Sequence, residues 1–293
     1  MTTTKGRHLL IGLPATGKTT FLAAFWYVVK RTPYDRALHV DALPDNLEYL
    51  NRICDAWLKG ETQERTIRGR VHRAAMRLRN PETNHSCEAV FPDLSGESFG
   101  QHWAQRQWDT DYDTLARTAS GVVLFIHPKR KDDSYNIADV ARAEAILREH
   151  SDHNPEATAS GATAQEPVPW DPLKAPTQVV LIDLLQFLVG EPCCHPRLKV
   201  CVIVSAWDLV EKQPKTPKRW LETEMAMLYQ FLTANPQIIE PCVYGVSAQG
   251  GDLADGQTRE RLLLEAEPVN RIRVVDADGQ ASDITEPMRW LIA

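Results

Sequence analysis

The sequence predicts an α/β fold in three layers, in which a mostly parallel β-sheet lies between helices and its second and third strands form an antiparallel hairpin. Short runs rich in Val, Ile and Leu alternate with helical segments, as they do where helices connect parallel strands. A glycine-rich stretch joins the first such run directly to a helix. Later, a segment that alternates apolar and basic residues leads into a turn and another apolar run, which predicts the hairpin. We expect one domain over residues 1–293, with insertions.

The glycine-rich stretch has the residues and spacing of a phosphate-binding loop. Its sequence, GLPATGKT at 12–19, follows an apolar strand at 8–11 and precedes a helical segment at 20–30. In such loops the glycines let backbone N–H groups turn toward the β- and γ-phosphates, the lysine adds a cation, and the threonine hydroxyl binds Mg²⁺. The helix adds the positive end of its dipole. We therefore expect a nucleoside triphosphate and Mg²⁺ to be bound by Gly12, Pro14, Ala15, Thr16, Gly17, Lys18, Thr19 and Thr20.

Between this helix and the hairpin, residues 45–60 are predicted to form an inserted helix. Apolar residues recur there at helical spacing, Asp45 and Glu48 have the pattern of a capping box, and a glycine ends the segment. Residues 71–79 then alternate apolar with basic side chains, and a turn over 80–82 leads to the next strand. These residues supply the first strand of the hairpin.

An acidic residue ends the second strand of the hairpin. The apolar run 87–91 leads into Pro-Asp-Leu-Ser-Gly-Glu at 92–97. A carboxylate at the tip of a strand can hold Mg²⁺ through its water shell, and we predict this role for Asp93. The backbone N–H of Gly96 would approach the γ-phosphate, and Glu97 would face the attacking water. The alternative is a simple strand-ending turn, because Asp, Ser and Gly all favour turns.

The rest of the chain continues the alternation of strands and helices. Residues 121–127 are apolar and predict a buried fourth strand. Residues 129–176 are predicted to be an insertion, which begins with a charged helical segment and ends in a flexible loop rich in Ala, Thr, Pro and Gly. The other predicted elements are a helix around 178–189, a strand at 198–204, an amphipathic helix over 220–232, strands at 243–246 and 271–275, and a closing helix at 286–292.

Composition limits the classes of function. The chain has a net charge of −6 and shows no basic footprint for nucleic acid. No apolar run approaches the roughly 20 residues that span a bilayer, and the N-terminus lacks the apolar core of a signal peptide. The six cysteines lack the paired C-x-x-C spacing of zinc sites. We expect a cytoplasmic protein.

Four motifs in this order resemble those of the Ras-like, TRAFAC-class phosphate-loop GTPases. After the phosphate loop, residues 93–96 match the D-x-x-G of that class, with Glu97 in place of its water-orienting Gln. Residues 205–208, SAWD, stand where the class has N-K-x-D, and 247–249, SAQ, where it has S-A-K. The combination is most similar to the bacterial GTPase domains called double-GTPases, which are found in predicted conflict and defence systems.

The resemblance implies that the last two motifs bind a guanine base. Asp208 would accept hydrogen bonds from the N1–H and exocyclic amine of guanine, a pattern of donors that adenine cannot present. Ser247 and Ala248 would meet the edge of the base. Apart from the resemblance, the side chain of Trp207 could pack near the base. Ser and Ala replace the Asn and Lys of N-K-x-D, so the motif keeps its acidic residue alone. The alternative for Asp208 is a turn or cap residue.

The resemblance also implies residues that sense the γ-phosphate. A threonine before the second strand binds Mg²⁺ in this class; Thr66 is the better-placed candidate and Thr62 the second, and a solvated loop threonine is the alternative for both. Arg106 follows the D-x-x-G motif closely and would supply a cation to the γ-phosphate, in its own chain or across a homodimer. The alternative is an arginine on a solvated helix face.

These features predict Mg²⁺-dependent binding of GTP and its hydrolysis to GDP and phosphate. We expect hydrolysis to be slow or stimulated by a protein partner, because the carboxylate of Glu97 is less favourable than an amide beside a polyanionic transition state. The output would be a molecular switch that acts on an effector. Two other classes stay open. One is an ATP-binding ATPase or kinase, which the incomplete N-K-x-D motif favours, and the other is a nucleotide-regulated scaffold without hydrolysis, which Glu97 favours.

Overall fold

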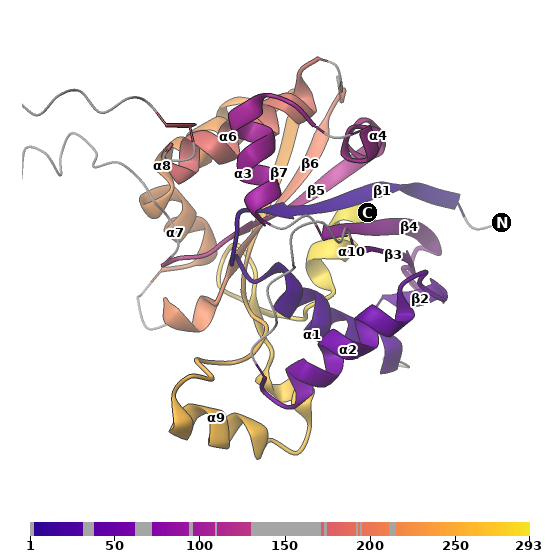
Figure 1. Cartoon of the computed structure of the whole chain (residues 1–293), viewed down its shortest axis with the longest axis vertical. Coiled ribbons are helices and arrows are strands. Elements are labelled where there is room, and N and C mark those ends of the chain that lie inside the picture. The colour runs from indigo at the N-terminus through magenta and orange to yellow at the C-terminus, as the bar shows by residue number, and fades with distance from the viewer. Residues whose placement is uncertain are drawn as a thin grey trace, which may run out of the picture.

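The computed structural model describes residues 3–31, 38–61, 72–93, 96–108, 110–129, 171–172, 175–191, 193, 195–210 and 215–293. These residues contain a nine-stranded sheet with the strand order β2-β3-β4-β1-β5-β6-β7-β8-β9. Helices cover both of its faces (Figure 1). The predicted α/β class is therefore confirmed. Most of the predicted insertion 129–176 lies outside the described residues.

Five parallel strands form the centre of the sheet. Their carboxyl ends are aligned, since Gly12 of β1 pairs with Phe125 of β5 and Ser205 of β6 pairs with Val246 of β7. In open parallel sheets, ligands bind just outside the carboxyl ends of the strands. The segments predicted to bind nucleotide follow these ends. The five strands are β4 (His85–Asp93), β1 (Thr3–Gly12), β5 (Ala119–Ile126), β6 (Leu198–Ser205) and β7 (Ile239–Ser247).

Antiparallel strands extend the sheet at both edges. The predicted hairpin is present: its first strand runs antiparallel to β4, with His72 opposite Asp93 and Arg79 opposite Ser86. The predicted strand at 271–275 is also present, slightly shorter. Two further strands have only four and two residues, too few to show a periodic pattern in the sequence. The edge strands are β2 (His39–Ala42), β3 (His72–Arg79), β8 (Arg273–Val275) and β9 (Ala281–Ser282).

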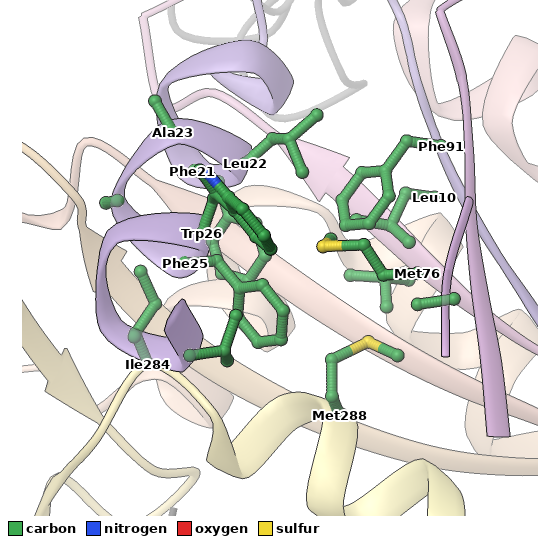
Figure 2. Packing of buried hydrophobic residues seen from close by; sticks show 14 of the residues in the cluster. Leu10, Phe21, Leu22, Ala23, Phe25, Trp26, Met76, Phe91, Ile284 and Met288 are labelled. Carbon is green, nitrogen blue, oxygen red and sulfur yellow. The ribbon is translucent and has the colours of Figure 1, made fainter. Parts of the chain in front are cut away.

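One face of the sheet packs against α1 (Lys18–Arg31), α2 (Leu47–Leu58) and α10 (Glu286–Ile292). Phe21 and Phe25 of α1 stack with ring centroids 5.7 Å apart, and Phe21 meets the ring of Phe125 on β5 edge-on at 5.2 Å. Figure 2 shows these α1 rings facing Met76 and Phe91 of the hairpin. This cluster therefore fixes α1, which follows the phosphate loop, against the sheet.

Other helices cover the opposite face. Because successive strand residues point to opposite faces, Leu9 and Ile11 pack here while Leu10 packs against α1. This layer contains α3 (Gly96–Gln105), α4 (Thr110–Thr118), α6 (Thr177–Val189), α7 (Pro217–Glu224) and α8 (Ala226–Ala234). A further helix, α9 (Gly256–Leu263), belongs to the C-terminal segment, residues 251–293, and extends away from the sheet (Figure 1).

Two helix predictions need correction. The single helix expected over 220–232 is two helices, since the backbone of the buried Met225 leaves the helical region at φ −134° and ψ 50°. The inserted helix begins at Leu47, and the expected capping box does not form: Asn46 is the N-cap and makes no side-chain capping bond. Within the described ranges, no helix is long and apolar enough to cross a membrane.

Candidate nucleotide-binding site

The phosphate loop connects β1 to α1 with backbone geometry that depends on glycine. Gly17 has a φ of +81°, a left-handed conformation that side chains disfavour. Gly12 lies so close to β5 that an added Cβ would approach the carbonyl oxygen of Phe125 to 2.9 Å. Pro14 and Ala15 are exposed at the tip of the loop, and Ala15 is itself left-handed at φ 55°.

Polar groups of the loop and of the first helical turn converge on one place. The Lys18 ammonium donates to the carbonyls of Gly12 at 2.7 Å and Leu13 at 2.9 Å. The Thr16 hydroxyl donates to the same Leu13 carbonyl at 2.9 Å. Helix α1 begins at Lys18, and its early N–H groups belong to the turn that has no helical carbonyl partners. Such a helix start, next to a lysine, is suited to bind an anion.

The D-x-x-G segment runs from the end of β4 to the start of α3. β4 is parallel to β1, with Leu9 opposite Val90. Each strand ends three residues beyond this pair, β1 at Gly12 and β4 at Asp93. The side chains of Asp93 and Glu97 lie outside the described part of the chain, as do Thr62 and Thr66.

The side chains predicted to recognise the base meet at the ends of β6 and β7. The buried Ser247 hydroxyl donates a hydrogen bond to the Asp208 carboxylate and accepts one from the Gly250 N–H at 3.1 Å. Ser205, at the end of β6, donates to the carbonyl of Ile126 at 3.1 Å. A Cβ placed on Gly17 would lie 3.4 Å from Ser205, so the phosphate loop adjoins this motif. The fold thus brings residues from distant parts of the sequence to one edge of the sheet.

Trp207 exposes little surface to which a base could bind. Its side chain is only 3% exposed and belongs to the apolar core beneath β6 and β7. The adjacent Ala206 is left-handed, at φ 46°, and the turn that it makes sends the indole inward. Trp207 therefore packs the motif against the apolar core and exposes almost no surface to a base.

The comparison with known families tests the resemblance carried by the four motifs. The sequence profile of Double-GTPase 1 matches residues 9–291. The chain belongs to the Double-GTPase 1 family. The matched range includes both the phosphate loop and the base-side segments, and the resemblance predicted from the four motifs is confirmed. No curated protein gives a significant match.

Solved structures with a similar chain path include three that are each 13% identical to this chain. The GTP-bound GTPase-like domain of Ski7 from S. cerevisiae has a TM-score of 0.40 over 87% of this chain and 45% of that chain. The bacterial selenocysteine-specific elongation factor EF-Sec has a TM-score of 0.36 over 90% and 29%. The SRb-GTP/SRX complex of Chaetomium thermophilum has a TM-score of 0.36 over 85% and 94%. The chain thus spans less than half the length of the first two.

Arg106 lies against α6. Its guanidinium pairs with Asp183 and lies 5.3 Å from the ring centroid of Phe187. The Trp103 indole donates to the same Asp183 carboxylate oxygen at 2.5 Å. These contacts hold the end of α3 on α6, and a finger role for Arg106 would require its ion pair to break. That role stays a prediction.

Sequence reasoning missed Trp57 of α2. Its indole N–H donates a 2.9 Å hydrogen bond to the carbonyl of Ala248. Ala248 belongs to the base-side loop, residues 247–250. The apolar spacing of α2 predicted a buried position for this residue, and burial is confirmed. No signal in the sequence could indicate which distant carbonyl the indole would meet, because the two residues are 191 positions apart.

Proposed function

We propose that this chain binds GTP with Mg²⁺ and hydrolyses it slowly, or with the help of a partner, as a molecular switch. The observation that carries the proposal is the Asp208–Ser247 pair, which follows strand ends next to a complete phosphate loop, since Ser205 at the end of β6 adjoins Gly17. The hydrogen bond from Ser247 orients the Asp208 carboxylate and leaves acceptor capacity for further donors. Guanine offers two adjacent donors, N1–H and the exocyclic amine, that match a carboxylate.

The residues of the loop fit a magnesium nucleotide. Mg²⁺ usually takes one or two protein ligands, and substrate phosphates and water complete its shell. Thr19 in the first turn of α1 and Asp93 at the end of β4 would supply the protein contacts, directly or through water. The described residues contain no group of three His, Cys, Asp or Glu side chains that could hold a metal without such a substrate. When bound, the ion would neutralise charge that develops on the phosphates.

Hydrolysis would use groups of the D-x-x-G segment and of the loop. Lys18 and the loop amides would stabilise charge on the γ-phosphate, Gly96 would bind it through its N–H, and Glu97 would orient water. Thr66 would complete the metal site in the GTP state. Loss of the γ-phosphate would then release the segments around Thr66 and Gly96, which is the switch. A protein effector, a homodimer and a role in bacterial defence are further expectations from the resemblance, and a cytoplasmic location is an expectation from the composition.

The test is a titration of the purified full chain with fluorescent analogues of GTP, GDP and ATP, with and without Mg²⁺. We expect guanine nucleotides to bind at least 10-fold more tightly than ATP, because one bidentate hydrogen-bonded pair contributes about this factor. Asp208→Asn should lose this preference and gain affinity for xanthosine triphosphate, whose C2 carbonyl accepts from an amide. ATP preference in the wild-type chain, unchanged in Asp208→Asn, would instead support an ATPase or kinase.

A scaffold without hydrolysis is the second candidate, and Glu97 in place of Gln is the observation that favours it. Single-turnover release of phosphate from bound GTP distinguishes the two. A working switch is supported if the protein releases phosphate faster than GTP hydrolyses in solution and if this acceleration is lost in Glu97→Ala. Tight GTP binding with no release, alone and with partners, supports the scaffold.

A further inference from the structure

Trp57 ties the base-side loop, residues 247–250, to a second element of the fold. Its indole Nε1 donates to the Ala248 carbonyl at 2.9 Å, and its side chain is completely buried. Within the loop, Ser247 accepts the Gly250 N–H and donates to Asp208, bonds that fix the loop to its own strand and to the end of β6. The Trp57 bond adds an anchor on a separate element, α2.

The indole is itself held in place by two neighbours. The ring of Tyr27, on α1, lies with its centroid 5.2 Å from that of Trp57. The guanidinium carbon of Arg271, from the C-terminal segment, lies 5.5 Å from the Trp57 ring centroid. Aromatic pairs and cations over indole rings at these distances are attractive. Trp57 therefore lies where the phosphate-loop helix, the base-side loop and the C-terminal segment meet.

The C-terminal end of α2, which carries Trp57, is fixed by arginines from the same C-terminal segment. Arg271 donates to the carbonyl of Leu58 at 3.2 Å. Arg259 donates to the carbonyls of Gly60 and Lys59, each at 3.4 Å. The last carbonyls of a helix have no partners within it, and these arginines supply donors. The end of α2 thus has a defined position from which its indole reaches the loop.

We propose that Trp57 is a positioning residue for base recognition, which holds the Ala248 carbonyl and so sets the loop 247–250 against the base. The inference rests on the proposed function, in which Ser247 and Ala248 meet the guanine edge. A loop that must be ordered at each binding event weakens affinity, and a loop already held in its bound form does not. Because the bond ends on the base-side loop, its loss should weaken base recognition and leave phosphate binding unchanged.

A matched control separates this role from ordinary core packing. Trp26 of α1 is also buried, 3% exposed, and its indole donates to the Asn51 side chain of α2 at 3.0 Å. Trp57→Phe and Trp26→Phe each remove one indole donor and keep an aromatic ring at an interface of α2. A purely structural role predicts the same consequences for both variants. The positioning role predicts a change in base recognition for Trp57→Phe alone.

The experiment measures Kd for GDP, GTP and inorganic triphosphate, each with Mg²⁺, on the full-length wild-type chain and both variants. Inorganic triphosphate probes the phosphate loop without a base. We expect Trp57→Phe to bind GDP and GTP about 5-fold more weakly, the factor given by one lost hydrogen bond, with faster dissociation of GDP. Its affinity for inorganic triphosphate should stay within about 2-fold of the wild type, because the phosphate loop keeps all its contacts. Trp26→Phe should retain wild-type affinity for all three ligands.

Several outcomes would overturn the proposal. If Trp57→Phe binds GDP and GTP as tightly as the wild type does, the positioning role is overturned. The proposed function still stands in that case, provided that the wild type prefers guanine nucleotides. Equal losses for GTP and inorganic triphosphate show general damage and also overturn it. If Trp57→Phe does not fold, replacement of the Trp57 indole by the isosteric benzothiophene removes the N–H at constant shape, and the same criteria apply. If the wild-type chain shows no preference for guanine nucleotides, both the proposed function and this inference are wrong.

Discussion

The two ends of the candidate site are built in different ways. The phosphate end is a continuous stretch, 12–20, in which backbone geometry, Lys18 and the start of α1 follow directly from adjacent residues. The base end is assembled from three separate segments: Asp208 after β6, Ser247 at the end of β7 and Trp57 on α2. The geometry of a local motif is determined by adjacent residues. The geometry of an assembled site depends on how the whole sheet and α2 place residues that are distant in the sequence.

This difference predicts how each end responds to change. Substitutions in the phosphate loop should weaken binding of every ligand that has a triphosphate, with or without a base. Substitutions at the base end should weaken guanine nucleotides and spare inorganic triphosphate. The ratio of the two affinities is therefore a readout of which end has been altered.

The largest effect is expected from Lys18→Ala at the phosphate end. The change removes an ammonium whose hydrogen bonds to phosphate are charge-assisted, so affinity for GTP, ATP and inorganic triphosphate should each fall on the order of 1000-fold. The ratio of GTP to inorganic triphosphate affinity should stay constant, since the base end is intact. Isothermal titration with all three ligands measures both quantities. Full affinity for any of them would contradict the assignment of the phosphate loop.

Much of this end could be predicted from the sequence, because its motif and its flanking strand and helix are contiguous. The order of the base-side motifs also predicted that Asp208 and Ser247 would come together. Trp57 could not be predicted in this role, since its hydrogen bond depends on the tertiary position of α2. The burial of Trp207 could not be predicted for a related reason: a residue next to Asp208 in the sequence is turned into the core at the left-handed Ala206.

The fold shows the same division between local and tertiary information. Long apolar runs such as β5 and β6 predicted the central strands, whose residues are buried on both faces. Strands β2 and β9 form by hydrogen bonding to the edges of β3 and β8, and they are too short to show a periodic pattern of apolar residues. The break at Met225 is similarly set by packing, because that residue is fully buried between α7 and α8.

A smaller effect is expected from His8, in the strand that carries the phosphate loop. The ring is 1% exposed, and neither of its nitrogens has a hydrogen-bond partner among the residues described. Burial, with the charge of Lys199 as a second cause, lowers the pKa of His8 from 6.5 to about 4. Between these values the unfolded chain takes up a proton and the native chain does not, so stability falls as the pH falls. The loss reaches about 3 kcal/mol by pH 4.

The variant His8→Leu removes this titration. Its free energy of unfolding, measured in urea from pH 7 to pH 4, should therefore fall less steeply than that of the wild type. Because β1 supports the whole sheet, acid should destabilise the fold without changing the ratio of GTP to inorganic triphosphate affinity while the protein is folded. Identical pH profiles for the two proteins would contradict the buried, neutral state of His8.

Of these three substitutions, Ser247→Ala at the base end is expected to have the smallest and most selective effect. The hydroxyl both orients Asp208 and accepts the Gly250 N–H, so its removal loosens two parts of the base-side loop. Two lost bonds, at about 5-fold each, should weaken the binding of GTP and GDP about 25-fold. Ser205→Ala is the matched control, because Ser205 ends the neighbouring strand and its hydroxyl bonds the Ile126 carbonyl instead of Asp208.

The comparison of the two serines tests whether the base end is an assembled unit. If Asp208 needs Ser247 for its orientation, Ser247→Ala weakens GTP but not inorganic triphosphate, and Ser205→Ala leaves the ratio of the two affinities unchanged. Combining Ser247→Ala with Trp57→Phe then gives a double-mutant cycle. Because both residues hold the same loop, we expect their combined loss of GTP affinity to be smaller than the product of the separate losses. A product of independent factors would show that the two anchors act on base recognition separately.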